Sequence, residues 1–173
     1  SGNDTTATGA SGDPFRSIQA GINFSSDADS VTVAAGTYVE NINFRGRNIK
    51  VAGADREMTI IDGDSNGTVV TFDSGEDATA LLSGFTIQNG FADYGAGIYY
   101  TNSNAALSNL KVIDNTTSFY GGGLYLQWSN PNIDNLIIQN NSAQRGGGIT
   151  CYANSSPTLK NISISANSST LGG

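Results

Sequence analysis

The stretch GGGLYLQWSNPNIDNLIIQNNSAQRGGG, residues 121–148, decides the fold, because it spans one whole repeat between two glycine triplets. A similar cluster, Gly95-Ala96-Gly97, begins 26 residues before the first triplet. The second triplet begins 25 residues after the first triplet. Outward from this stretch, apolar and asparagine residues recur in columns at an offset of 26. The columns are Leu81/Leu107/Ile133/Leu159, Leu110/Leu136/Ile162, Thr86/Val112/Ile138/Ile164, Asn89/Asn115/Asn141/Asn167 and Asn109/Asn135/Asn161. A fixed period of this size indicates a solenoid, a propeller or an array.

Each repeat contains two short segments of strand character and no helical stripe. One set alternates apolar and polar residues at 97–100, 124–127 and 149–152, and the other lies at 85–87, 110–113, 136–138 and 162–164. Alternation is the signature of a half-buried strand. Because single repeats of this length cannot bury an apolar face, we expect successive coils to stack at about 4.8 Å and to share one core. Earlier strands are expected at 31–33, 42–44, 49–51, 60–61 and 69–72.

The asparagine columns and the glycine triplets have a structural interpretation in such a coil. Asparagine tolerates left-handed backbone angles at a bend, and stacked amides can hydrogen-bond to one another as a ladder. Glycine triplets indicate sharp bends or close backbone approach. They do not fit the G-x-G-x-x-G pattern and precede no helix, so they do not predict a phosphate-binding loop.

The chain divides into an arm and a solenoid. Residues 1–13 are small and polar and predict a flexible N-terminal arm, and residues 14–173 form the β-helix, with coils over about 30–173. Asp13-Pro14 has the character of a helix start, with Phe15, Ile18 and Ile22 on one face, so 14–24 is expected to be a capping helix. No cap is visible at the C-terminal end. That end is therefore predicted to be open, either because the sequence is a fragment or because another molecule or domain covers it.

Composition excludes several classes of function. The 173 residues include 13% charged side chains, carry a net charge of −7 and contain no histidine. An acidic chain is a poor partner for nucleic acid or an anionic membrane surface. The missing histidine removes the commonest general base and metal ligand. No apolar run reaches the ~20 residues of a membrane span, and the lone Cys151 is expected to be a small core residue.

Three motifs resemble a known superfamily. The stretch AAGTYVENI at 34–42 resembles the opening coil of pectin-lyase-like β-helix proteins, and IIDG at 60–63 is similar to their second coil. The glycine bends and the segment IQNN at 138–141 resemble repeats of polymorphic outer-membrane proteins and related bacterial surface β-helices. The resemblance implies an all-β, right-handed, single-stranded parallel β-helix. The repeat sets about 26 residues per coil, and the pattern at 14–24 adds a short N-terminal capping helix. It is not specific for activity, since this fold hosts both enzymes and adhesins.

The catalytic patterns of the superfamily are not matched. Pectate lyases use a basic residue beside calcium-binding carboxylates, whereas the basic residues of this chain do not recur in one column. Pectin methylesterases use paired aspartates with glutamine and arginine. Here Asp114 follows Gln88 in one column and Asp134 lies between Ser108 and Lys160 in another, and neither is a pair of carboxylates. We therefore predict no catalytic residues, no required cofactor and no enzymatic activity.

One segment is a candidate for calcium. Asp62-Gly63-Asp64-Ser65-Asn66-Gly67 fits the start of a D-x-D-x-N-G loop, and Asp73 occupies the twelfth position. Calcium binds several oxygen ligands from such a loop. The competing interpretation is an ordinary turn between two strands, which the flanking strand patterns favour.

Aromatic residues predict a ligand-binding face at Tyr99, Tyr125, Trp128 and Tyr152. If Ile98, Leu124 and Ile149 point inward, the tyrosines point outward, while Tyr100, Leu126 and Cys151 point in. Exposed aromatic rings stack on sugars or anchor protein contacts. A surface ladder that only stiffens the sheet is the alternative.

Eight N-x-S/T sequons are present, and six of them are candidates for glycosylation. The candidates are Asn3, Asn23, Asn66, Asn115, Asn140 and Asn154, whereas Asn161 and Asn167 lie in ladder columns.

Two functions follow from these observations. The first is a non-enzymatic extracellular or cell-surface protein, structural or adhesive, whose open C-terminal end pairs with other copies of itself in a filament or with another surface protein. The second is a carbohydrate-binding or lyase-like polysaccharide-active module that binds glycans on the tyrosine face.

Overall fold

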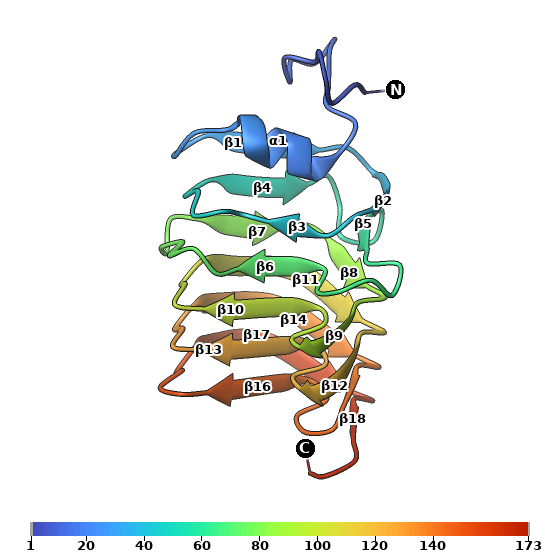
Figure 1. Ribbon diagram of the computed structural model, residues 1–173, viewed down its shortest axis with the longest axis vertical. Coiled ribbons are helices and arrows are strands. Elements are labelled where there is room, and N and C mark those ends of the chain that lie inside the picture. Colours follow the sequence, from blue (N-terminus) through green and yellow to red (C-terminus); the bar gives the residue numbers. More distant parts are fainter. Residues whose placement is uncertain (1, 173) are drawn as a thin grey trace.

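The chain winds into a right-handed parallel β-helix of about five turns. The structure is a computed structural model that describes residues 2–172, so Ser1 and Gly173 of the predicted arm and last coil lie outside the described residues. Successive coils stack along one axis, with the N-terminal end at the top of Figure 1 and the C-terminal end at the bottom. All pairings between its named strands are parallel.

Three sheets form the walls of the solenoid. The first contains β1 (Ser30–Val33), β2 (Gly36–Val39), β4 (Lys50–Gly53), β5 (Thr59–Asp62), β7 (Leu81–Ser83), β8 (Thr86–Gln88), β11 (Ala106–Ile113), β14 (Asn132–Gln139) and β17 (Thr158–Ser165). The second contains β3 (Ile42–Asn43), β6 (Val70–Phe72), β10 (Ile98–Thr101), β13 (Leu124–Gln127) and β16 (Ile149–Tyr152). The third contains β9 (Phe91–Tyr94), β12 (Thr116–Tyr120), β15 (Ser142–Ala143) and β18 (Ser168–Ser169). The strands expected from alternation are all present, and the third sheet was not predicted.

The first sheet bends without interruption at an asparagine. β11 pairs with both β7 and β8, because this eight-residue strand continues through Asn109, whose φ is 51°. Asn135 and Asn161 bend β14 and β17 at the same place, with φ of 56° and 54°. The Asn135 side-chain amide donates to Asn109 Oδ1 at 3.2 Å. The prediction that this column marks bends is confirmed, since asparagine adopts the left-handed region at small cost.

The strand register corrects three of the predicted columns by one residue. Leu82, not Leu81, pairs with Leu107, and Ile87, not Thr86, pairs with Val112. Gly90, not Asn89, precedes Asn115 in the asparagine column, because its N–H donates to Asn115 Oδ1 at 2.8 Å. The reason is that the step between these two coils is 25 residues, so an offset of 26 places the earlier residue one position too early.

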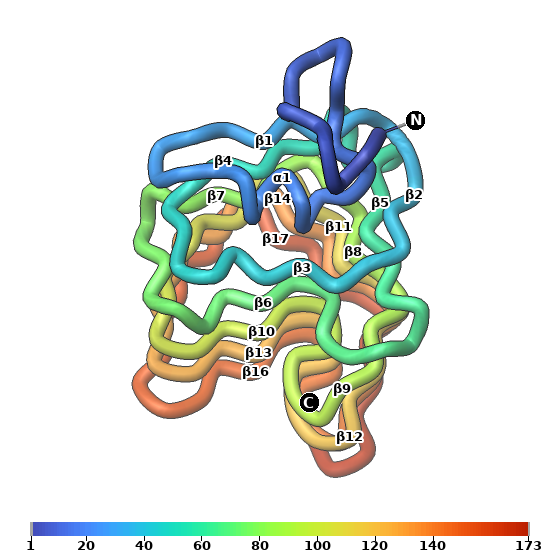
Figure 2. The backbone as a smooth tube through the Cα atoms, turned by 45° about the horizontal axis from the view of Figure 1, so that its top comes forward, coloured from blue at the N-terminus to red at the C-terminus, as the bar shows by residue number. Residues whose placement is uncertain are grey.

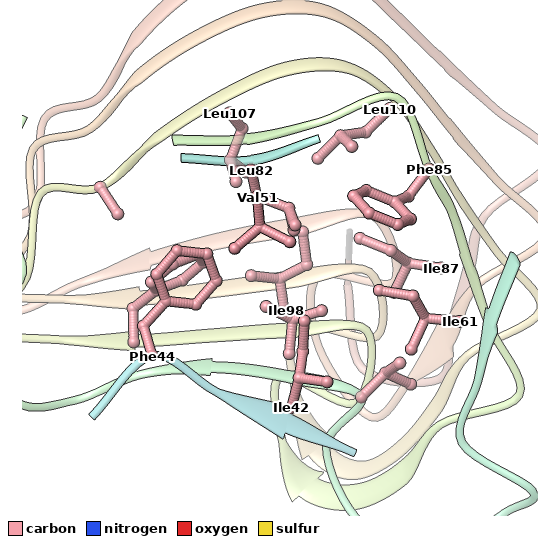
Figure 3. Packing of buried hydrophobic residues seen from close by; sticks show 14 of the residues in the cluster. Ile42, Phe44, Val51, Ile61, Leu82, Phe85, Ile87, Ile98, Leu107 and Leu110 are labelled. Carbon is pink, nitrogen blue, oxygen red and sulfur yellow. The ribbon is translucent and has the colours of Figure 1, made fainter. Parts of the chain in front are cut away.

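Apolar side chains fill the interior along the whole solenoid. Figure 3 shows Val51, Leu82, Leu107 and their neighbours converging from the sheets into one core. On one side of this core, Phe44, Phe72 and Tyr100 form an aromatic stack with ring centroids 4.5 and 4.6 Å apart. The buried Tyr100 hydroxyl donates to the Ala105 carbonyl at 2.7 Å. Its inward direction, like that of Leu126, confirms the predicted alternation.

The asparagine ladder lies at a corner of the coils. The Asn115 side-chain amide donates to Asn141 Oδ1 at 3.0 Å, and the Asn141 amide donates to Asn167 Oδ1 at 3.0 Å. The same oxygens accept from the backbone N–H groups of Asn115 and Asn141. The predicted ladder is confirmed for these three residues. Close glycines surround it, since a Cβ added to Gly123 would lie 2.6 Å from the Gly148 oxygen.

A second polar ladder at the end of the second sheet was not predicted. Ser103 N–H donates to Ser129 Oγ at 3.2 Å, and Ser129 N–H donates to Ser155 Oγ at 3.1 Å. At its upper end, the Ser103 hydroxyl donates to the buried Glu76 carboxylate at 2.7 Å. Gly46 N–H donates to the other oxygen of Glu76 at 2.8 Å. Each buried polar group of this ladder therefore has a partner in the neighbouring coil.

A short helix covers the N-terminal end, but it begins later than predicted. α1 spans Ile18–Phe24, and its N-cap is Ser17 rather than Asp13. Glu40 of the first coil accepts from the N–H groups of Ile18 and Gln19 at 2.8 and 2.9 Å. Its burial raises the pKa of Glu40 above the usual value, against the effect of these two bonds. A carboxylate at this position satisfies N–H groups that have no partner within the helix.

The predicted N-terminal arm is held against the start of the helix. Asp4 Oδ1 accepts from the N–H groups of Arg16 and Ser17 at 2.7 and 2.9 Å. The Ser17 N–H bond is the largest of the contacts that hold the pKa of Asp4 below its usual value. The arm therefore continues the capping end of the solenoid, above α1 in Figure 1.

Among the described residues, no helix is long and apolar enough to cross a bilayer.

The last described coil differs from the inner coils in exposure. Cys151 pairs with Leu126 in an inward column, yet it is exposed, so the prediction that it is a core residue is wrong. The reason is that no described coil stacks over it. Leu159 and Ile164 are exposed for the same reason, although their partners Ile133 and Ile138 are buried. Pairing of this face with another molecule stays a prediction.

Candidate ligand-binding cleft

Three tyrosines follow one another along the outer face of the second sheet. Tyr99 of β10 pairs in register with Tyr125 of β13, and their rings stack with centroids 5.7 Å apart and an interplanar angle of 9°. Tyr152 of β16 pairs with Gln127, two positions along the strand, but its ring lies 6.3 Å from that of Tyr125. The predicted outward direction of these residues therefore holds.

Two further tyrosines approach this row from the third sheet. Tyr94 ends β9 and Tyr120 ends β12, and their rings stack with centroids 5.9 Å apart and an interplanar angle of 6°. Tyr94 also lies 5.4 Å from Tyr125 at a steeper angle of 53°. The Arg145 guanidinium donates to the Tyr120 hydroxyl at 2.9 Å and lies over its ring at 5.8 Å. Aromatic pairs at these separations are mutually attractive.

The two rows enclose a cleft of about 390 Å³. Figure 2 shows β9 and β12 projecting outward beside the wall formed by β10, β13 and β16. The residues that line the cleft are Tyr94, Tyr99, Tyr120, Tyr125, Gln127 and Tyr152. At the base of the cleft, Tyr125 is only 5% exposed. At the rim of the cleft, Tyr94 and Tyr152 are 41% and 55% exposed. A bound molecule would therefore meet the rim rings first and the phenol groups of the base beneath them.

An irregularity in the repeat forms one lip of the cleft. Between Thr117 and Tyr120, β12 carries one residue more than β9, which pairs with it through Ala92 and Tyr94. The next coil is again shorter, since Thr116 pairs with Ser142 and Tyr120 with Arg145. The extra residue makes a β-bulge, which changes the direction of the side chains that follow it. The exposed Phe119 in this bulge lies 5.8 Å from Tyr94.

The chemistry of the cleft is that of neutral phenols. Burial raises the pKa of Tyr125 to about 12, and the neighbouring hydroxyls of Tyr99, Tyr152, Tyr94 and Tyr120 add to this effect. Each neutral phenol both donates and accepts hydrogen bonds. Gln127 adds an amide with the same double capacity. Among the described residues that line the cleft there is no carboxylate.

The structure brings together most, but not all, of the predicted ligand-binding residues. Tyr99, Tyr125 and Tyr152 line the cleft, whereas Trp128 lies in the turn after β13, outside the lining. The prediction missed Tyr94 and Tyr120, because they belong to a sheet that was not foreseen. A signal for them was present, since each immediately precedes the first glycine of a repeat, at Gly95 and Gly121.

The structure does not bring Asp73 together with the other three proposed calcium ligands. Asp62 Oδ2 accepts from the side-chain amides of Gln88 and Asn89, both at 2.8 Å. Partial burial opposes ionisation of Asp62, but these bonds and the Asp64 N–H outweigh it and hold its pKa below the usual value. Asp73 follows β6 in another sheet and contacts Asn43 and Ser74 instead. Over residues 2–172, no three His, Cys, Asp or Glu side chains are grouped to hold a metal. The predicted calcium set is therefore corrected: Asp62, Asp64 and Asn66 lie in a turn bonded to the next coil through Asp62, and Asp73 lies outside this turn.

One of the two predicted aspartate columns changes with the register. Gln88 pairs with Ile113, so Asp114 does not follow it in one column. Asp134 does lie between Ser108 and Lys160, as predicted.

Among the sequons, Asn115 is buried with its amide bonded in the ladder, so it is not accessible for glycosylation. The other five candidates are exposed, and their modification stays a prediction. They are Asn3, Asn23, Asn66, Asn140 and Asn154.

Comparison with known proteins identifies the family of the chain. The profile of a family described as "Protein of unknown function (DUF1565)" matches residues 1–171. The chain belongs to the DUF1565 family. No curated protein matches this DUF1565 chain.

A solved structure has a similar fold. It is a crystal structure of a mutant pectin methylesterase in complex with a hexasaccharide, with a TM-score of 0.55 and 12% sequence identity. The alignment covers 94% of the DUF1565 chain and 66% of the methylesterase chain. At this identity the likeness concerns the fold alone, and it supports the parallel β-helix described above.

Proposed function

We propose that this DUF1565 protein is a non-catalytic, extracellular carbohydrate-binding protein that adheres to glycans through the tyrosine cleft. The observation that carries the proposal is the convergence of two tyrosine rows on one concave site. The predicted adhesive role and its carbohydrate-binding alternative are combined in this assignment, because a glycan-binding cleft can serve adhesion directly.

The shape and chemistry of the cleft suit a sugar. Binding sites combine apolar walls with a few polar groups that fix orientation. The half-exposed rings of Tyr94 and Tyr152 offer apolar faces to the C–H face of a pyranose ring. The phenols of Tyr99 and Tyr120 and the amide of Gln127 offer donors and acceptors to its hydroxyl groups. A purely apolar ligand would leave these polar groups without partners.

The irregular repeat supports a functional interpretation over a stiffening role. A ladder that only stiffened a sheet would keep the regular register, as the asparagine corner does. Here the bulge at Ser118 and Phe119 departs from both neighbouring coils directly beside the aromatic rows. Departures from local regularity are expected where a site is built rather than where a fold is maintained.

The side chains in the cleft support binding without turnover. Hydrolysis of a glycosidic bond generally uses two carboxyl groups on either side of the bond. The described residues of the lining supply phenols and one amide. With its pKa raised to about 12, Tyr125 is protonated at neutral pH and supplies almost no phenolate to act as a general base.

A binding experiment tests this function. Affinity electrophoresis would compare migration in gels containing hydroxyethylcellulose, galactomannan, xylan or polygalacturonate. We expect retardation by at least one polysaccharide, and Tyr152→Ala should weaken it about tenfold, equivalent to about 1.4 kcal/mol. Phe24→Ala is the matched control, because it removes an exposed aromatic ring at the far end of the solenoid and should leave retardation unchanged.

Two results would count against the proposal. Unretarded migration in all four gels would remove the support for carbohydrate binding. Release of reducing ends or methanol from a bound polysaccharide, lost in Tyr152→Ala, would show that the cleft is catalytic.

A further inference from the structure

Trp128 occupies an unfavourable position for a large residue. It follows Gln127 at the end of β13, with φ of 48° and 49% of its surface exposed. Left-handed backbone angles are uncommon for bulky residues, whereas asparagine and glycine adopt them readily. The preceding coil has Asn102 at this turn, with φ of 51°. Because the indole is half-exposed, burial in the core does not account for tryptophan at this position.

The turn that carries Trp128 lies next to the tyrosine cleft. Gln127, which lines the cleft, immediately precedes Trp128 and pairs with Tyr152 in the next coil. The Trp128 N–H donates to the carbonyl of Ala153, the residue after Tyr152, at 3.1 Å. Along the strand direction, Tyr120 therefore comes first and Tyr125 second. Trp128 follows, with Tyr152 of the next coil beside Gln127. Trp128 comes three positions after Tyr125, which corresponds to about 10 Å of extended strand.

We propose that the cleft is the centre of an extended site for an internal segment of a linear, neutral polysaccharide. This inference rests on the proposed function and deepens it. The polysaccharide runs along β13 and β16, with one sugar in the tyrosine cleft and a further sugar stacked on Trp128. Tryptophan at a strained, half-exposed position is then retained for contact with ligand rather than for packing.

Charge favours a neutral ligand over an anionic one. The chain has a net charge of −7, which repels a polyuronate at long range. The lining side chains are neutral, and the nearby Arg145 guanidinium is directed to the Tyr120 hydroxyl and ring. A polyuronate would meet five phenols and one amide in this cleft, without a cation aligned to each of its carboxylates.

An oligosaccharide length series separates the extended site from a single pocket. Isothermal titration calorimetry would use cellobiose and cellohexaose, mannobiose and mannohexaose, xylobiose and xylohexaose, and a galacturonate hexamer as the anionic probe. We expect a neutral hexamer to bind at least tenfold more tightly than its dimer, with little dependence on salt. Trp128→Asn should abolish most of this advantage while leaving the affinity for the dimer within twofold.

The variants are chosen so that loss of folding is not mistaken for loss of a subsite. Trp128→Asn introduces the residue that the preceding coil has at this turn, so its thermal midpoint should equal or exceed that of the parent. Trp128→Phe retains an aromatic face and should restore part of the hexamer affinity. Tyr152→Ala should weaken dimer and hexamer alike, because it removes a ring of the central cleft.

The outcomes distinguish the extended site from the proposed function itself. Equal affinity for dimer and hexamer, or an equal effect of Trp128→Asn on both, overturns the extended site but leaves a single carbohydrate pocket. Preference for the galacturonate hexamer overturns the neutral ligand. Absence of binding by every oligosaccharide, together with unretarded migration in the polysaccharide gels, overturns the proposed function and this inference with it.

Discussion

The asparagine corner and the tyrosine cleft are built from the same coils, yet they use the repeat in opposite ways. At the corner, Asn115, Asn141 and Asn167 follow one another at 26 residues, and the amides of the first two each donate to the next asparagine. At the cleft, the register changes at the β12 bulge and the rings of two sheets converge on open space. Regular stacking satisfies the polar groups of the protein itself, whereas the irregular coil leaves aromatic rings around an open cleft.

The largest expected effect comes from breaking the corner. Asn115→Ala removes a buried amide that donates to the Ile87 and Ile113 carbonyls and accepts from Gly90 N–H. Because these backbone groups would remain buried without partners, we expect a loss of about 3 kcal/mol in the free energy of unfolding. Denaturant unfolding followed by circular dichroism measures this loss.

The matched control for the corner is Asn140→Ala. Asn140 is exposed at a left-handed position, and Ala166 occupies the equivalent position of the next coil, with φ of 54°. For Asn140→Ala, the loss in the free energy of unfolding should stay within about 1 kcal/mol. Equal losses in both variants would mean that the ladder adds nothing beyond backbone conformation.

A smaller effect is expected from making the cleft regular. Deletion of Ser118 leaves one residue between Thr117 and Tyr120, as in the neighbouring coil that carries Asp93. The Phe119 ring should then move away from Tyr94, because removal of one residue reverses the side-chain alternation. We expect glycan affinity to fall about fivefold, equivalent to about 1 kcal/mol, with the thermal midpoint nearly unchanged.

The deletion is compared with the parent in the same affinity gels. Deletion of Gly12, an exposed residue of the arm, is the control for shortening the chain. Undiminished retardation after deletion of Ser118 would show that the bulge does not shape the binding surface.

The smallest effect concerns the pH dependence of the cleft. The pKa of Tyr125 is raised to about 12 in the folded chain, against an ordinary value of 10.0. The folded state therefore retains this proton longer than the unfolded state does. The resulting stabilisation is complete below about pH 10 and is lost as the pH rises through about 12.

Tyr125→Phe removes this titration without removing the ring. Between pH 9 and pH 11, its free energy of unfolding should therefore decline less steeply than that of the parent, and ultraviolet titration should lose one late-ionising phenol. Tyr100→Phe provides a comparison, since burial also raises the pKa of Tyr100 well above the usual value. Identical slopes in Tyr125→Phe and the parent would contradict an environment for Tyr125 that disfavours ionisation.

Much of the fold could be predicted because neighbouring coils impose the same chemistry at a near-constant interval. Leu107 and Ile133, or Asn115 and Asn141, recur at 26 residues and pair in register. The prediction slipped by one residue at Leu81, Thr86 and Asn89, where the coil is shorter. A fixed offset cannot detect that change, because it depends on where a loop bulges rather than on the strand residues.

The candidate site was predicted in part for the same reason. Tyr99 and Tyr125 follow the repeat and were found, whereas Tyr94 and Tyr120 reach the cleft from a separate sheet. Trp128 was selected for its exposed aromatic character, but its left-handed turn is a property of the folded backbone. Exposure of Cys151 could not be foreseen from its inward column, since burial there requires another coil above it.

The sequence by itself determined the period, the inward apolar columns, the bends at asparagine and glycine, and the absence of a repeated catalytic pattern. These features are local or repeat at short range, so residue type and spacing are sufficient to specify them. Only the tertiary structure decided which tyrosines face one another, how deeply Tyr125 is buried, and that Asp73 lies apart from the other calcium candidates. Those relations depend on the lateral distance between sheets and on single-residue changes in coil length, and hydrophobic patterning along the chain encodes neither.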